Sequence, residues 1–146
     1  YALLCGPLHV RHGGIVKDPE FGDLHPCSDF VDPALQLDAH VAPLGIKFYT
    51  GKMFPADYKG KAFIAEHGSW NRSKKVGYRI MMVDIEDGEA VNSEPFIDGW
   101  LDEAEQKATG RPVDLLLLKD GSMLISDDYG DAIYRVSYNE TALANN

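Results

Sequence analysis

The stretch Gly60–Arg72, with the sequence GKAFIAEHGSWNR, decides how this chain is expected to fold. Its first half alternates in the manner of a β-strand, and its second half is a loop crowded with polar and aromatic side chains. A strand that ends in such a loop places reactive groups on a rigid support. The alternative is a structural loop in which Trp70 packs on the sheet and His67 is an ordinary packed histidine.

A second stretch, Gly121–Tyr138 (GSMLISDDYGDAIYRVSY), repeats this pattern. When Gly60 is aligned with Gly121, the residues of 63–66 match those of 124–127. The repeat extends upstream, where Pro43–Ile46 matches Pro112–Leu115, and downstream, where Tyr78–Ile80 matches Tyr134–Val136. Short strands that repeat while the loops between them differ in length indicate a β-propeller or another repeat fold.

Composition and charge limit the class of protein and its partners. The chain has 146 residues, of which 45% are hydrophobic and 25% charged, as expected for a domain with a core. Its formal net charge of −9 argues against nucleic acid or an anionic membrane as a partner, because both require a basic surface. No apolar run approaches the ~20 residues that span a bilayer. Tyr1 does not begin a leader pattern, so we expect a mature, trimmed or partial chain.

Residues 1–32 are predicted to be irregular, because glycine and proline interrupt them repeatedly. The histidines of this segment lack the paired cysteines of a usual zinc site, so we expect them to be solvated. Cys5 and Cys27 lie in the same segment. A disulfide between them would restrain a loop-rich region of an exported protein, whereas two free thiols would suit a cytosolic one. The residues alone leave both alternatives open.

Residues 33–146 are predicted to be all-β. A first group of strands forms an antiparallel meander at 44–49, 61–66, 77–85 and 89–97. A second group has three strands, at 113–118, 122–127 and 132–138. Asp87 and Gly88 are a hairpin signal between the last two strands of the first group.

Four shorter features complete this prediction. Ala34–Asp38 is a candidate strand that precedes the first group. A single helical turn is expected at 54–60, with proline in its first turn. Residues 100–109 are expected to form a turn or two of helix. The run Leu115–Leu118 is apolar on both faces, which is typical of a strand buried on both sides.

The segments that carry these patterns resemble the glucose/sorbosone dehydrogenase family. They are His40–Tyr49 (HVAPLGIKFY), Glu66–Arg72 (EHGSWNR) and Gly110–Tyr138. Asp18–Gly22 together with Pro26–Phe30 is similar to its sorbosone-dehydrogenase-like branch. Members of the family are soluble sugar dehydrogenases that depend on pyrroloquinoline quinone (PQQ) and fold as six-bladed β-propellers. The resemblance covers the C-terminal part of the family. It implies a propeller fragment of about two four-stranded blades, at 40–100 and 108–138.

The resemblance also implies a location and a set of cofactor-binding residues. The family is largely exported, which favours the disulfide and a periplasmic or secreted protein. Its members contact the quinone carboxylates with a basic pair at the start of the strand after the acidic loop. Arg111 stands at the first of these positions, and Val113 replaces the second. Some relatives also carry a lysine in the loop after the central strand, where His67, Asn71 and Arg72 are the candidate substitutes here.

Physical chemistry supports Arg111 as a ligand for a tricarboxylate, because a guanidinium donates two parallel hydrogen bonds to a carboxylate. The alternative is a solvated arginine at the start of a strand. Asp127 and Asp128 are candidate ligands for calcium at a strand end, although a full shell takes roughly six or more oxygens.

The other catalytic groups are expected outside this chain. In the family, the histidine that acts as general base toward the sugar lies in earlier blades, as does the calcium site that polarises the quinone. No residue here matches them. The chain is therefore expected to contribute cofactor-side residues of a PQQ-dependent sugar dehydrogenase and to be inactive alone. The alternative is a noncatalytic propeller fragment that binds a sugar, a small acid or only itself.

Two isolated blades would leave strand edges and apolar faces uncovered. If the Ala34–Asp38 strand of one copy completed the three-stranded blade of the next copy, the contact would be head-to-tail and would have to close into a ring. Three copies would restore six blades. We therefore expect a homo-oligomer formed by head-to-tail strand exchange.

Overall fold

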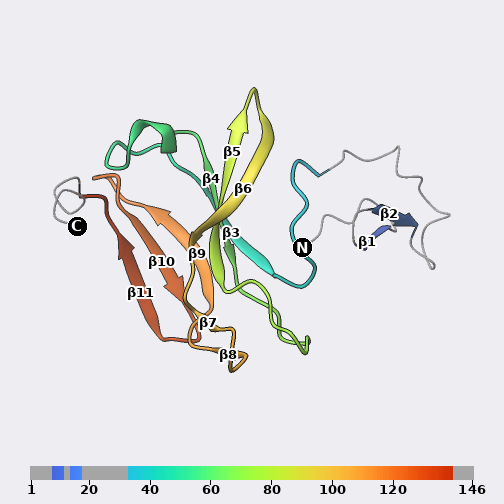
Figure 1. Ribbon diagram of the computed structural model, residues 1–146. Coiled ribbons are helices and arrows are strands. Elements are labelled where there is room, and N and C mark those ends of the chain that lie inside the picture. Colours follow the sequence, from blue (N-terminus) through green and yellow to red (C-terminus); the bar gives the residue numbers. More distant parts are fainter. Residues whose placement is uncertain (1–7, 12–13, 18–32, 140–146) are drawn as a thin grey trace.

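The computed structural model describes residues 8–11, 14–17 and 33–139 (Figure 1). Within these residues the only helix is a 3-10 turn at Ala56–Tyr58, which confirms the short turn expected there. All other regular structure in this part of the chain is antiparallel β-sheet, as the all-β prediction requires. The described residues hold no helix long and apolar enough to cross a membrane.

The first large sheet has the strand order β3-β4-β5-β6. Its strands are β3 (Pro43–Phe48), β4 (Ala62–Glu66), β5 (Arg79–Glu86) and β6 (Glu89–Ile97). Asp87 and Gly88 both have positive φ and form the hairpin between β5 and β6, because Asp-Gly tolerates the left-handed conformations that such turns need. The predicted meander is confirmed.

The second large sheet has the strand order β11-β10-β9. Its strands are β9 (Pro112–Leu117), β10 (Met123–Asp127) and β11 (Ala132–Val136). β9 and β10 pair in the same register as β3 and β4, which confirms the upstream repeat. The equivalent pairs are Pro43–Glu66 with Pro112–Asp127, and Ile46–Ile64 with Leu115–Ile125.

Downstream of these strands the predicted match of 78–80 with 134–136 is wrong. The observed pairs are Ala65 with Ile80 and Ser126 with Ile133. Ile80 therefore corresponds to Ile133. The shared Tyr-Arg dipeptide misled the alignment, because the loop after β10 is much shorter than the loop after β4.

Three other local predictions are wrong. Ala34–Asp38 is not a strand in the structure. Residues 100–109 form a small hairpin of β7 (Leu101–Asp102) and β8 (Lys107–Ala108) instead of a helix. The carboxylate of Asp102 accepts the N–H groups of Ala104 and Glu105, both at 3.0 Å, and so favours a tight turn. Leu116 is 53% exposed, so β9 is not buried on both sides in this chain.

The first 32 residues contain regular structure where irregular structure was predicted. β1 (Leu8–Arg11) and β2 (Gly14–Lys17) pair as antiparallel strands. Cys5, Cys27 and the rest of that segment lie outside the described residues. The disulfide, and the export that it would accompany, therefore stay predictions.

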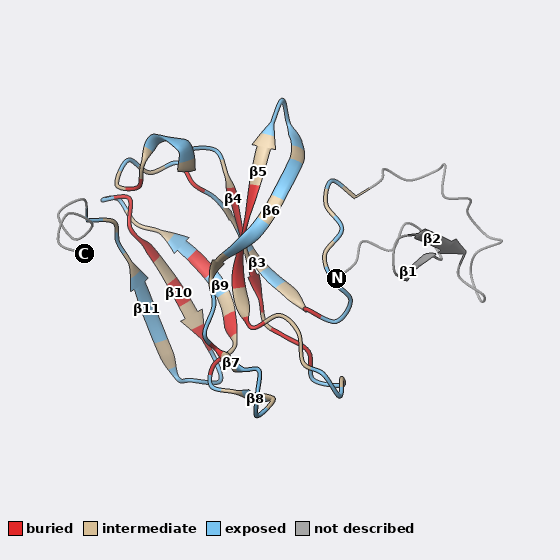
Figure 2. Cartoon of the chain, in the orientation of Figure 1, coloured by how far each residue is buried: buried red, intermediate tan, exposed pale blue. Residues whose placement is uncertain are grey.

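The core lies between the two large sheets (Figure 2). Buried residues line β4, β5, β9 and β10, whereas β6 and β11 are largely exposed. Its main contributors are Phe63, Ala65, Ile80 and Met82 from the first sheet, and Leu115, Met123 and Ile125 from the second. The two sheets thus pack on one another like adjacent blades.

Tyr49 joins the first sheet to the turn that precedes β10. Its buried ring stacks on Phe54 with 4.7 Å between the ring centroids. Its hydroxyl donates to the Gly121 carbonyl oxygen at 2.9 Å. The Tyr49 hydroxyl oxygen in turn accepts the N–H groups of Met53 at 3.1 Å and Phe54 at 2.9 Å. One hydroxyl therefore satisfies three backbone groups.

Tyr49→Phe is expected to lower the free energy of unfolding by about 2 kcal/mol, because these backbone groups lose their partner while the ring packing is kept. Urea unfolding at a fixed protein concentration measures the change. Tyr129→Phe is the matched control, since the Tyr129 side chain is 59% exposed, and it is expected to change stability by less than about 0.5 kcal/mol. Equal losses in the two variants would contradict the role of the Tyr49 hydroxyl.

Candidate functional site

One end of the two large sheets gathers the loops that carry most of the predicted cofactor residues. β4 and β10 end there, and β5, β9 and β11 begin there, in the lower part of Figure 1. Neighbouring strands run antiparallel in both sheets. The loop between β4 and β5 and the loop between β10 and β11 therefore lie at the same end.

Arg111 reaches from the second sheet to the β4–β5 loop of the first. Its Nε donates to the His67 carbonyl oxygen at 3.0 Å, and its Nη2 donates to the Gly68 carbonyl oxygen at 2.7 Å. The guanidinium carbon lies 5.6 Å from the centre of the Tyr78 ring. The side chain is half-buried and engaged, so the solvated alternative for Arg111 is wrong.

His67 bridges the two sheets at the same place. Its Nε2 lies 2.9 Å from Oδ1 of Asp128, which follows β10. The His67 side chain is 18% exposed, and that of Asp128 is 62% exposed. The structural alternative for this loop fails in one respect, because Trp70 is 83% exposed and does not pack on the sheet. His67, Arg111 and Asp128 thus form one cluster, which we call the loop-end cluster.

Asn71 and Arg72 do not belong to the loop-end cluster. Arg72 donates from Nη1 to the Ala39 carbonyl oxygen at 3.1 Å, ahead of β3. Asn71 is exposed. Among the hydrogen bonds and ion pairs of residues 33–139, neither side chain contacts His67 or Arg111.

Asp127 organises the loop between β10 and β11. Its Oδ1 accepts the N–H groups of Arg111 at 2.8 Å, Tyr129 at 3.0 Å and Gly130 at 2.8 Å. Its Oδ2 accepts the hydroxyl of Tyr134 at 3.1 Å. Burial acts to raise the pKa of Asp127, but these hydrogen bonds outweigh burial and hold the pKa below its ordinary value.

The predicted calcium ligands do not form a fitting donor set. Both oxygens of Asp127 already accept N–H or O–H donors, and Asp128 contacts His67. In the described part of the chain, no three histidine, cysteine or acidic side chains are grouped to hold a metal. We therefore derive no role for calcium at these residues.

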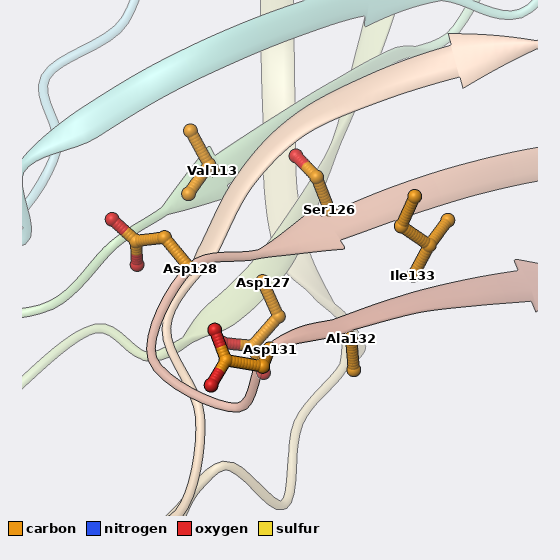
Figure 3. A pocket seen from close by; sticks show the side chains of 7 residues that line it. All are labelled: Val113, Ser126, Asp127, Asp128, Asp131, Ala132 and Ile133. Atoms are coloured by element: carbon orange, nitrogen blue, oxygen red, sulfur yellow. The ribbon is translucent and has the colours of Figure 1, made fainter.

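An open hollow of about 380 Å³ lies beside the same loop, on the face of the second sheet that points away from the first (Figure 3). It is lined by Val113, Ser126, Asp127, Asp128, Asp131, Ala132 and Ile133. In this view Asp128 lies on the other side of the loop from Asp127 and Asp131. Three carboxylates repel an anion, so this hollow does not suit the carboxylates of a quinone.

Sequence reasoning missed an ion pair on the first sheet. Glu66 is fully buried, and its Oε2 accepts a hydrogen bond from Nε of Arg79 at 2.7 Å. Asp38 lies 3.7 Å from the same guanidinium. Burial raises the pKa of Glu66, and Arg79 offsets part of this shift. The two residues stand opposite one another on β4 and β5, so correct pairing of the predicted strands would have revealed the contact.

Comparisons with solved structures agree with this architecture. A structure of a carbohydrate-active enzyme of family AA12 from Trichoderma reesei is 29% identical, with a TM-score of 0.63, over 75% of this chain and 28% of that one. The PQQ domain of pyranose dehydrogenase from Coprinopsis cinerea is 23% identical, with a TM-score of 0.53, over 76% of this chain and 30% of that one. At this identity the second match supports the fold alone.

Curated sequences give two further relatives. An uncharacterized protein of Borreliella burgdorferi is 51% identical over 111 residues, which are 75% of this chain and 29% of that protein. The PQQ-dependent pyranose dehydrogenase of Coprinopsis cinerea is 40% identical over 53 residues, which are 36% of this chain and 6% of that protein. The chain spans less than a third of the length of each of these relatives. A family model named TrAA12-like matches residues 15–139, so the resemblance to PQQ-dependent sugar dehydrogenases is confirmed and the chain belongs to the TrAA12-like family.

Proposed function

We propose that this chain supplies two consecutive blades of a PQQ-dependent sugar oxidoreductase, and that the loop-end cluster faces the quinone. The observation that carries the proposal is the reach of Arg111 across the two sheets to the carbonyl groups of His67 and Gly68. This contact holds a half-buried cation at the end of the sheets where the loops meet.

The loop-end cluster fits one carboxylate of the quinone. Arg111 uses Nε and Nη2 for its backbone partners, and its Nη1 takes part in none of the hydrogen bonds of residues 33–139. A planar guanidinium fixed in this way is oriented to donate to an anion at low entropic cost. Val113 supplies no second charge. When bound, the quinone accepts the two electrons that leave the sugar.

Sugar oxidation also needs a base within hydrogen-bond reach of the substrate hydroxyl. His67 is engaged by Asp128 through Nε2 and is not assigned this role. We place the base in the part of the relatives that this chain does not span. The 146-residue chain is accordingly expected to bind the quinone without reducing a dye acceptor in the presence of sugars.

Arg111→Met is expected to weaken PQQ binding about tenfold to a hundredfold, because a hydrogen bond to a charged group contributes about 1.5–3 kcal/mol. Titration of the chain with PQQ, followed by absorbance, measures the dissociation constant. Arg135→Met is the matched control, since Arg135 pairs with Asp120 at the opposite end of the same sheet and its side chain is 57% exposed. This control should bind PQQ like the unaltered chain.

The trimethyl ester of PQQ lacks the carboxylate charges and keeps the ring system, so it tests whether binding depends on those charges. It should bind the unaltered chain as weakly as PQQ binds the Arg111→Met variant. Equal affinities of the two arginine variants for PQQ would contradict the proposed role of Arg111. So would an ester that the unaltered chain binds as tightly as it binds PQQ. Circular dichroism spectra that match that of the unaltered chain establish that each variant is folded.

A further inference from the structure

Tyr78 stands immediately before β5 in a conformation that is unusual for a tyrosine. Its φ is 61°, in the left-handed region that bulky side chains rarely adopt. The residue is 3% exposed, so it is held in this conformation inside the protein. A bulky residue keeps such a conformation only where its surroundings require it, and residues of this kind gather at binding sites.

The repeat shows that the fold needs a left-handed residue at this position but does not need an aromatic one. By strand register Ile80 corresponds to Ile133, so Tyr78 corresponds to Asp131 of the second sheet. Asp131 has a φ of 48°, and aspartate is one of the residues that tolerate this conformation. The tyrosine ring of the first sheet therefore serves something other than the turn itself.

The Tyr78 side chain holds the β4–β5 loop. Its hydroxyl donates a hydrogen bond to the Ser69 carbonyl oxygen. Its ring packs on Gly68, where an added Cβ would lie 2.6 Å from ring carbons of Tyr78. The N–H of Gly68 donates to the Val41 carbonyl oxygen at 2.8 Å. The loop is thus fixed at the residues whose carbonyl groups bind Arg111.

The same ring contacts the Arg111 guanidinium. The guanidinium carbon lies 5.6 Å from the ring centre, within the ~6 Å over which a cation is attracted to an aromatic face. The carbonyl groups of His67 and Gly68 accept two hydrogen bonds from this guanidinium. Tyr78 therefore acts on Arg111 twice, through its ring and through the loop that it fixes.

We propose that Tyr78 is the positioning residue of the loop-end cluster and holds the Arg111 guanidinium in place before an anion arrives. The inference rests on the proposed function for the identity of that anion, which is a carboxylate of the quinone. A long side chain that is already fixed loses less conformational entropy on binding. Tyr78 thereby raises the affinity of the site through Arg111.

Hydrogen exchange at Arg111 tests this role without the quinone. Nuclear magnetic resonance of the full chain with nitrogen-15 label resolves arginine Nε–H signals, and the Arg111→Met variant identifies the one that belongs to Arg111. In the unaltered chain this proton should exchange slowly, because Nε donates to a carbonyl oxygen. Tyr78→Leu should speed its exchange about fivefold or more, whereas Tyr78→Phe keeps the ring and should retain most of the protection.

A second pair of variants leaves both side chains in place. Gly68→Ala puts a methyl group where the Tyr78 ring lies, so it should speed the exchange as Tyr78→Leu does. Gly60→Ala is the matched control, because Gly60 has a φ of 87° against 93° for Gly68, and a Cβ there meets nothing within 4 Å. It adds the same backbone strain and should leave the exchange unchanged. Circular dichroism establishes that each variant is folded.

Two exchange results would overturn the proposal. One is an Arg111 Nε–H that exchanges in the unaltered chain as fast as in free arginine, which decides the matter even where a variant does not fold. The other is an exchange rate that neither Tyr78→Leu nor Gly68→Ala alters.

Titration with PQQ connects this role to the proposed function. Tyr78→Leu should weaken binding about threefold to thirtyfold. In the Arg111→Met background it should cause no further loss, because the tyrosine acts through the arginine. A further loss in that background would overturn the positioning role. An unaltered chain that does not bind PQQ would contradict the proposed function, while the exchange measurement would still decide whether Tyr78 holds Arg111.

Discussion

Replacing Asp127 by alanine is expected to lower the free energy of unfolding by about 3–5 kcal/mol. Asp127 is 4% exposed, and its carboxylate accepts three backbone N–H groups together with the hydroxyl of Tyr134. These four hydrogen bonds are part-buried and contribute about 0.5–1.5 kcal/mol each, and alanine leaves no atom to replace the oxygens. Because one of the donors is the N–H of Arg111, the loss also loosens the start of β9. Urea unfolding measures the change.

Asp131→Asn is the matched control for this experiment. Asp131 is in the same loop, is exposed and has a positive φ that asparagine tolerates, so the change should stay within about 0.5 kcal/mol. The pKa of Asp127 lies below its ordinary value of 3.8. Its charged form therefore contributes stability above that value, and this contribution is lost as the pH falls through the folded-state pKa. Asp127→Asn should lose this part of the acid dependence, and an unchanged acid transition would contradict the assignment.

Replacing Arg79 by methionine is expected to lower the free energy of unfolding by about 3 kcal/mol at neutral pH. Glu66 is fully buried, and the substitution would remove the Arg79 Nε that lies 2.7 Å from its Oε2 and leave a buried charge without that partner. Glu66→Gln in the same chain should recover most of the loss, because it removes that charge. Arg135→Met serves as the control, since it breaks an exposed ion pair that contributes less than about 1 kcal/mol.

The pH dependence of the Arg79→Met variant separates a buried charge from a simple loss of packing. Burial raises the pKa of Glu66 above 4.5, and Arg79 normally offsets part of that shift. The folded state therefore holds the proton more tightly than the unfolded state. The resulting stability is fully present below about pH 4.5 and is lost as the pH rises through the folded-state pKa. Arg79→Met should steepen this loss, whereas equal destabilisation at both ends of the range would indicate packing alone.

Much of the fold could be predicted because the information is local. Alternation along 61–66 and 77–85 and the Asp87-Gly88 turn each depend on neighbours in the sequence, and the structure confirms the strands that they predict. Two pairs of strands match in register, β3 with β9 and β4 with β10, which explains why the repeat was visible. Alternation failed at 34–38, because a strand also needs a neighbouring strand to pair with, and residues 33–139 provide none there.

The candidate site was predicted only in part. His67 and Arg111 were identified from residue types and from a family resemblance, and the structure brings them together. Asn71 and Arg72 were chosen because they are near His67 in sequence. The loop turns away after His67, so that Arg72 contacts Ala39 instead and Asn71 is exposed. Asp127 was considered as a metal ligand, although its geometry shows a carboxylate that binds backbone N–H groups.

The amino-acid sequence by itself determined the strands, the hairpin turn and the membership of a repeat family, because periodicity and turn chemistry act over a few residues. Only the tertiary structure decided that Arg111 binds the loop of the other sheet and that Glu66 is buried against Arg79. The physical reason is that these properties depend on which groups lose contact with water. That outcome is set by packing between segments far apart in the chain.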